Sequence, residues 1–202
     1  AEHADALGGM LLVHSVAGGT GSGAGCAAAA ALRDAFPAVN MLSCAVCPFE
    51  SGEVAVQSYN ALLTLDAVSA AADGIILQRN ESLASLATSR YGVRSPALSD
   101  LNGLAADAIA SCLAHSGASH AGCSHSSSPL RPLPDLCEHL CCHPAYKLLT
   151  PHVAPHVPHA ARDFEKLHWP AVLKELRRSM EARAQNVHAA NPRCAGGRAG
   201  GG

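Results

Sequence analysis

Residues 11–25 read LLVHSVAGGTGSGAG, and this stretch decides the fold. An apolar run typical of a buried strand, Met10–Val16, leads into a glycine-rich turn, and an alanine-rich helix begins at Ala24. Five glycines within eight residues let the backbone approach an anion closely and adopt positive φ angles. The helix turns its unpaired N–H groups and its positive dipole end toward the turn. This order predicts a phosphate-binding loop, to which Thr20 and Ser22 add hydroxyl donors.

The residues after the turn narrow the class of phosphate loop. A Walker-type loop ends in Lys followed by Ser or Thr, and neither comes after Gly23, so that class is excluded. The dinucleotide pattern G-x-G-x-x-G/A is met by Gly19, Gly21 and Ala24. That pattern also requires an acid at the end of the next strand, where the nearest one is Glu50. A dinucleotide-dependent oxidoreductase therefore stays open as an alternative.

Beyond the turn, strand patterns and helix patterns alternate along the chain. The strands are continuous apolar runs, as buried parallel strands are. Such alternation predicts an α/β fold with a doubly wound, mostly parallel sheet. We expect strands at 10–16, 39–47 and 75–78, and helices at 24–35, 54–72, 81–90 and 100–116. Ligands of such sheets bind outside the carboxyl ends of the strands, here after Val16, Cys47 and Gln78.

The composition changes after residue 116, which suggests a domain boundary. A stretch rich in Ser, Gly, His and Pro comes next, and we expect it to form a flexible loop. After it come a short helix at 135–141, a strand of a second layer at 146–150, and a helix from Trp169 to about Arg183. The expected divisions are a sheet domain at 1–116, a loop at 117–134, a core-helix region and the start of a second α+β domain at 135–190, and a disordered glycine-rich tail at 191–202.

Length and charge exclude several classes of protein. The chain has 202 residues, 49% of them hydrophobic, which is enough for one sizeable core. A net charge of −2 argues against nucleic acid as the main partner, and no apolar run is long enough to predict a membrane span. The first residues lack the features of a signal peptide and an initiator Met, so we expect a partial chain. Nine cysteines without a secretion signal predict reduced thiols in the cytoplasm.

Two groups of cysteines could in principle bind a metal or carry out redox chemistry. Cys44 and Cys47 form a C-x-x-C, but they lie within an apolar strand, where residues three apart face opposite sides. Small buried thiols are the favoured interpretation of this pair. The Cys- and His-rich segment 137–159 matches no standard zinc spacing, so we predict no metal site and leave its role open.

The glycine stretch resembles the signature of the tubulin and FtsZ superfamily of GTPases. Residues 52–65 resemble the tubulin segment that enters the helix contacting the ribose. The loop at 48–53 is shorter than in alpha, beta and gamma tubulins and is similar to the delta branch of the family. Two later segments, 135–144 and 164–176, resemble the delta branch as well. The resemblance extends from about Gly9 to about Arg183, with a divergent stretch at 117–128.

The resemblance implies a GTP site. The glycine loop would wrap the phosphates of GTP or GDP, Glu53 and Gln57 would lie near the ribose, and Asn80 and Asn102 would contact the guanine edge. Leu98 stands where the family places an aromatic ring against the base. Mg²⁺ would accompany the nucleotide, with ligands outside this chain. The implied nucleotide contacts are Ala17, Gly18, Gly19, Thr20, Gly21, Ser22, Gly23, Glu53, Gln57, Asn80 and Asn102.

The resemblance also implies assembly. In tubulins the acid that assists hydrolysis comes from the longitudinal neighbour, and Asp135 matches that position. The alternative is that Asp135 only caps the helix after Pro134. Partners would be other tubulins, in cytoplasmic microtubules and in centriole or basal-body assembly. The family's earlier pocket loops do not occur here, so the domain is incomplete, the isolated chain is expected to be inactive, and a structural relative without nucleotide stays open.

Overall fold

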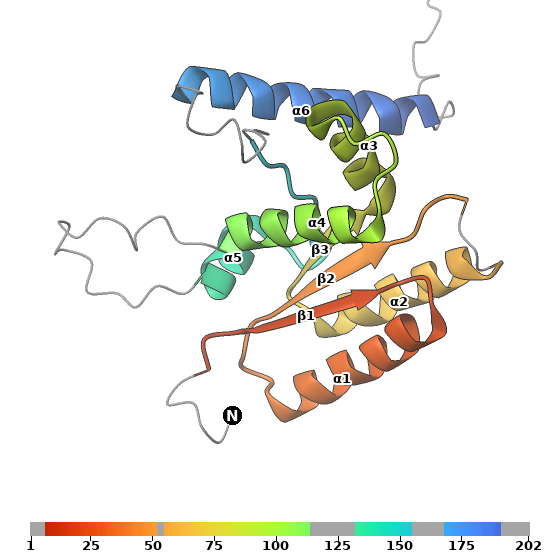
Figure 1. Cartoon of the computed structure of the whole chain (residues 1–202). Coiled ribbons are helices and arrows are strands. Elements are labelled where there is room, and N and C mark those ends of the chain that lie inside the picture. Colours follow the sequence, from red (N-terminus) through yellow and green to blue (C-terminus); the bar gives the residue numbers. More distant parts are fainter. Residues whose placement is uncertain (1–6, 52–54, 114–131, 155–167, 191–202) are drawn as a thin grey trace, which may run out of the picture. The chain divides into compact units, whose positions relative to one another are not determined.

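We describe the fold from a computed structural model of the chain. It describes residues 7–51, 55–113, 132–154 and 168–190. The chain divides into two compact units, residues 1–151 and 152–202, and each is described by itself. The first unit contains a sheet with helices on both faces (Figure 1). The second contributes one described helix, α6 (Trp169–Ala190), which begins where the sequence predicts it.

Four parallel strands form a single sheet in the order β1-β2-β3-β4. Their bounds are Met10–Ser15 for β1, Met41–Cys47 for β2, Gly74–Arg79 for β3 and Leu148–Leu149 for β4. The expected α/β class with a parallel sheet is confirmed. In the register, Val13 of β1 lies opposite Cys44 of β2, which lies opposite Ile76 of β3. The carboxyl ends of the first three strands therefore lie along one edge of the sheet.

The prediction of a second layer at 146–150 is wrong, because β4 extends the same sheet beside β3. Ile75 donates its N–H to the carbonyl of Lys147 at 2.8 Å. The Nζ atom of Lys147 donates to the carbonyls of Ser69 and Ala72, both at 2.8 Å. These bonds hold Lys147 beside the start of β3, where the chain enters β4.

The helices keep the expected order with shifted ends. The chain becomes helical at Thr20 rather than at Ala24, through a wide π-helical turn. The α3 helix (Asn80–Tyr91) is followed by Gly92, whose φ of 69° and N–H bond to the Ala87 carbonyl close the last turn. The helical elements of the first unit are η1 (Thr20–Ala24), α1 (Gly25–Ala35), α2 (Gln57–Ala71), α3 (Asn80–Tyr91), α4 (Leu98–Leu113) and α5 (Pro132–Leu140).

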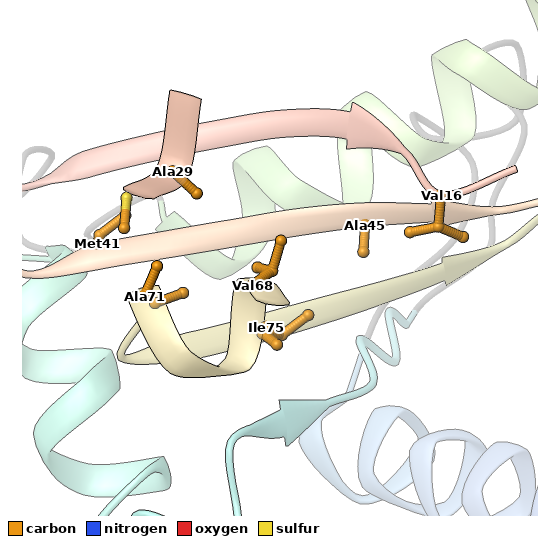
Figure 2. Packing of buried hydrophobic residues seen from close by; sticks show 8 residues of the cluster. Val16, Ala29, Met41, Ala45, Val68, Ala71 and Ile75 are labelled. Atoms are coloured by element: carbon orange, nitrogen blue, oxygen red, sulfur yellow. The ribbon is translucent and has the colours of Figure 1, made fainter. Parts of the chain in front are cut away.

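Both faces of β2 and β3 are largely buried, which explains why these strands are apolar throughout, whereas Leu11 and Val13 of β1 are exposed. Alternate residues of β2 serve opposite faces. On one face α1 and α2 pack over a cluster drawn in Figure 2, whose labelled members are Val16, Ala29, Met41, Ala45, Val68, Ala71 and Ile75. On the other face Leu42, Cys44 and Ile76 pack against Cys137 of α5, with partly buried residues of α4 around them.

The C-x-x-C pair confirms the prediction of opposite faces. Cys44 belongs to the cluster under α5, whereas Cys47 packs against the cluster under α1 and α2. Burial, with smaller contributions from Cys47 and Cys112, raises the pKa of the Cys44 thiol to about 11. Cys44 is thus a protonated core residue at neutral pH and not a reactive thiol.

The boundary between the compact units differs from the expected one. The sequence predicts a core-helix region and the start of a second domain at 135–190, whereas the first unit extends to Pro151. The reason is that α5 is a core helix of the sheet, with Leu133, Leu136 and Cys137 packed on its second face. The expected loop at 117–134 lies outside the described residues except for its last three, which belong to α5. The expected tail at 191–202 also lies outside them.

Candidate nucleotide-binding site

The glycine loop, residues 17–23, lies at the carboxyl edge of the sheet, between β1 and α1. Its backbone is held from within by Ser22, whose Oγ donates to the carbonyl of Gly18 at 2.7 Å. The N–H of Ser22 donates to the same carbonyl at 2.9 Å. The buried hydroxyl of Ser22 is therefore occupied inside the loop and does not serve as the free donor that the sequence predicts. Thr20 is exposed at the first helical turn.

The glycines of the loop do not serve the conformational role that the sequence predicts. Among the described residues only Gly92 has a positive φ, so the expectation of positive φ in the loop is wrong. Gly21 is needed for close packing instead, because a Cβ there would lie 2.7 Å from the carbonyl oxygen of Ser15. By contrast, a Cβ at Gly18, Gly19 or Gly23 would meet no atom within 4 Å. One glycine therefore seats the loop on β1, and the other three border open space.

A buried polar pair supports the start of α1. The Nε2 atom of His14 lies 2.9 Å from the Oγ of Ser43 on the neighbouring strand, and both side chains are buried. A Cβ on Gly25 would come within 3.0 Å of the His14 ring. The first residue of α1 therefore sits directly against the ring, which brings the helix N-terminus close to the end of β1.

The first turn of α2 holds two loops with side-chain amides. Asn60 donates from Nδ2 to the carbonyl of Ala17 at 2.8 Å. Gln57 donates from Nε2 to the carbonyls of Phe49 and Glu50 at 3.0 and 3.3 Å. Gln57 thus directs its N–H groups at the loop after β2. Sequence reasoning missed Asn60, although its position three residues after Gln57 puts both on one helix face.

The end of β3 contributes Asn80, the first residue of α3, which is half-buried. The preceding residue, Arg79, forms ion pairs with Glu50 at 3.8 Å and with Glu81 at 3.7 Å. The Glu81 carboxylate also accepts the backbone N–H of Glu50. These contacts join the loop after β2 to the start of α3. Glu53, the other predicted ribose contact, lies outside the described residues.

Asn102 lies on α4, where its side chain is exposed. Gln78, two residues before Asn80, donates from Nε2 to the carbonyl of Ala105 at 3.4 Å. This bond ties the end of β3 to the turn of α4 that comes after Asn102, so the two predicted base-reading asparagines lie on neighbouring segments. Leu98, at the start of α4, is 67% exposed.

Asp135 lies at the opposite edge of the sheet from the glycine loop. It is an exposed residue of α5, the helix whose Leu133 would contact a Cβ on Gly9, just before β1. The Sγ atom of Cys141, just after α5, lies 3.0 Å from the Cβ position of Gly74 at the start of β3. A six-residue strand spans about 20 Å. The structure therefore does not bring Asp135 to the loop of its own chain.

Metal ligation and membrane insertion find no support in the part of the chain that the structure describes. No group of three or more His, Cys, Asp or Glu side chains there could hold a metal ion. No helix among the same residues is long and apolar enough to cross a membrane. His156 and His159, part of the histidine-rich segment, lie outside the described ranges.

The segment that contains the glycine loop matches a known protein family. Residues 1–88 match the family model described as the GTPase domain of the Tubulin/FtsZ family. Over this segment the chain is similar to the Tubulin/FtsZ family. The segment includes β1, the glycine loop, Gln57 and Asn80, and it ends before Asn102 and Asp135. The match favours the GTPase interpretation over the dinucleotide-dependent oxidoreductase that the spacing of the glycines allowed.

Curated relatives extend the likeness beyond this segment. The chain is 29% identical over 184 residues to the tubulin delta chain of Mus musculus and 28% identical over 184 residues to that of Homo sapiens. Both matches cover 91% of this chain and 40% of the relative. The chain therefore spans about 40% of the length of these curated relatives. It is delta-tubulin-like at modest identity, and the region of likeness includes most of the chain.

Proposed function

We propose that this chain binds GTP and GDP through the glycine loop. The observation that carries the proposal is the seating of residues 17–23 between the carboxyl end of β1 and α1, with the helical run beginning at Thr20 in η1. Gly21 packs against Ser15 there, while Gly18, Gly19 and Gly23 border open space. The first turn of a helix has N–H groups without intrahelical acceptors, and its dipole favours an anion. Phosphate oxygens are the natural acceptors for these groups.

Recognition of the base rests on Asn80 and Asn102. A carboxamide offers both a donor and an acceptor, which suits the guanine edge, where a carbonyl and N–H groups alternate. Adenine presents a different order of donors and acceptors, so an amide pair arranged for guanine would leave polar groups unpaired with adenine. Leu98 in place of an aromatic ring gives the base an apolar contact without ring stacking.

A competition titration tests the proposal. Fluorescent GTP is titrated into the chain, and unlabelled GTP, GDP, ATP and NAD are added as competitors. We expect GTP and GDP to displace the probe and ATP to require about tenfold higher concentration. This factor corresponds to the free energy that one mispaired hydrogen-bonding group costs. Equal competition by ATP would refute guanine recognition by the two asparagines. A chain that binds no nucleotide would instead be a structural tubulin relative.

The cellular role that we propose is tubulin-type assembly of the delta kind, in microtubules and in centriole or basal-body formation. The delta-tubulin likeness over 184 residues supports this role. Longitudinal contact with another tubulin would place the Asp135 edge of one subunit against the nucleotide edge of the next. The position of Asp135 at the edge opposite the loop supports action on a neighbour's nucleotide. Imaging of the tagged protein against a centriole marker tests this role, and a diffuse signal would contradict it.

A further inference from the structure

Asn60 lies where two loops of the carboxyl edge meet α2. Its Nδ2 donates to the carbonyl of Ala17, the first residue of the glycine loop, at 2.8 Å. On the same helix turn Gln57 holds the loop after β2 through the carbonyls of Phe49 and Glu50. The Asn60 side chain is half-buried, and its helix packs on the sheet beside α1 (Figure 1). A helix that is fixed on the sheet thus supplies the anchor of a loop that contains mostly glycine.

The bond to Ala17 has a consequence for the next residue. The Ala17 carbonyl and the Gly18 N–H belong to one planar peptide unit and, in the trans form, point in opposite directions. Fixing the carbonyl toward α2 therefore aims the Gly18 N–H away from α2. No hydrogen bond among the described residues occupies that N–H, and the Cβ position of Gly18 borders open space.

From this geometry we infer that Asn60 is a positioning residue that orients the Ala17–Gly18 peptide for an anion. Glycine has the widest conformational freedom, so the peptide would otherwise sample several orientations. The N–H of Ala17 donates to the Oγ of Ser15 at 3.3 Å. The carbonyl of Ala17 is therefore the group through which Asn60 of α2 orients the following peptide. The ligand class is the phosphate chain of a nucleotide. The effect on affinity rests on the proposed GTP binding, whereas the effect on the loop does not.

The first test uses the chain without nucleotide. Amide exchange is followed by NMR in wild type, Asn60→Ala, Asn60→Asp and Asn60→Gln, with Ser58→Ala, an exposed neighbour on the same turn, as the matched control. The reporter is the Ser22 N–H, which donates to Gly18. We expect exchange about five- to tenfold faster in the Ala and Asp variants, and no change in Ser58→Ala. The Gln variant keeps the donor and is expected to restore part of the protection.

The second test adds GTP to the same variants. We expect the Ala variant to bind about five- to tenfold more weakly, and the Asp variant to bind more weakly still, because its carboxylate repels both the Ala17 carbonyl and phosphate. Unchanged Ser22 exchange in Asn60→Ala would overturn the inference. Equal acceleration of exchange in the strands would overturn it too, since Asn60 would then be a general stability residue. If the wild-type chain fails to bind GTP, the proposed function fails, while the exchange data still decide the role of Asn60.

Discussion

The amino edge and the carboxyl edge of the sheet are held by different contacts. The difference separates residues that we expect to stabilise the fold from residues that we expect to bind the ligand. At the amino edge, Arg33 donates to the carbonyls of Pro37, Val39 and Ala71 and pairs with Asp73 at 2.8 Å. At the carboxyl edge, neutral amides of α2 hold carbonyls of two loops and leave the glycine backbone open. The guanidinium of Arg33 fixes the amino edge, whereas a neutral amide holds the glycine loop at the carboxyl edge, where the ion pairs of Arg79 join the loop after β2 to the start of α3.

The largest expected effect is at the amino edge. Replacing Arg33 by Ala removes three bonds to carbonyls and the pair with Asp73, whose carboxylate also accepts the N–H of Met41 at 2.8 Å. Bonds to charged groups are worth more than neutral ones, so we expect a loss of about 2–4 kcal/mol in the free energy of unfolding, measured by urea denaturation. Arg33→Lys should recover a minor part, because an ammonium lacks the planar fork of donors. The nucleotide affinity of the folded fraction should not change. A changed affinity would show that contacts at the amino edge also affect the nucleotide site, which contradicts the comparison.

A matched pair of glycines sharpens the comparison within the loop itself. A Cβ at Gly21 meets the carbonyl of Ser15 at 2.7 Å, whereas one at Gly23 meets nothing within 4 Å. Gly21→Ala should therefore cost about 1–3 kcal/mol of stability through overpacking. Gly23→Ala should leave stability unchanged or slightly raised, while it lowers GTP affinity by filling space at the ligand. Equal losses of stability in the two variants would refute the distinction between packed and open glycines.

The buried thiols predict a dependence of stability on alkaline pH. Burial raises the pKa of Cys44 from 9.0 to about 11, and it does the same for Cys137. Between pH 9 and 11 the unfolded chain loses these protons while the folded chain keeps them, so the free energy of unfolding falls as pH rises. Below pH 9 this contribution is fully present. Thermal unfolding at about pH 8 and about pH 10.5 measures the fall, which should be smaller in Cys44→Ala; an equal fall would assign it to other groups.

Base selectivity gives a smaller effect that is confined to the carboxyl edge. Asn80→Ala should reduce the preference for GTP over ATP about five- to tenfold, because one polar pair with the base is lost. Ser82→Ala, an exposed change two residues later on α3, is the control and should leave the preference unchanged. Competition titrations measure both. A preference that survives in Asn80→Ala would move base reading to Asn102 or to residues outside this chain.

Much of this arrangement could be predicted from local patterns. The glycine loop, three strands and their helices follow from apolar runs and turn residues, since each pattern reports the burial of its own segment. The side chains of the site were harder to predict. The inward bond of Ser22 and the reach of Asn60 to Ala17 depend on how segments up to 43 residues apart pack. The place of β4 depends on Lys147 reaching the end of α2, which no local pattern encodes.

The smallest effect on stability is expected at Asp135. Its substitution tests whether the Asp135 edge of one subunit contacts the nucleotide edge of the next subunit in an assembly. This exposed carboxylate lies on α5, at the edge away from the loop. Asp135→Asn should change stability by less than about 0.5 kcal/mol, as exposed substitutions usually do, and should leave GTP affinity unchanged. If the carboxylate acts on a neighbour's nucleotide, GTP turnover should rise with protein concentration in the wild type and not in Asp135→Asn. Turnover that is independent of concentration, or equal in both, would leave Asp135 only a carboxylate in the first turn of α5, and not the cap that the alternative interpretation predicts, because α5 begins at Pro132.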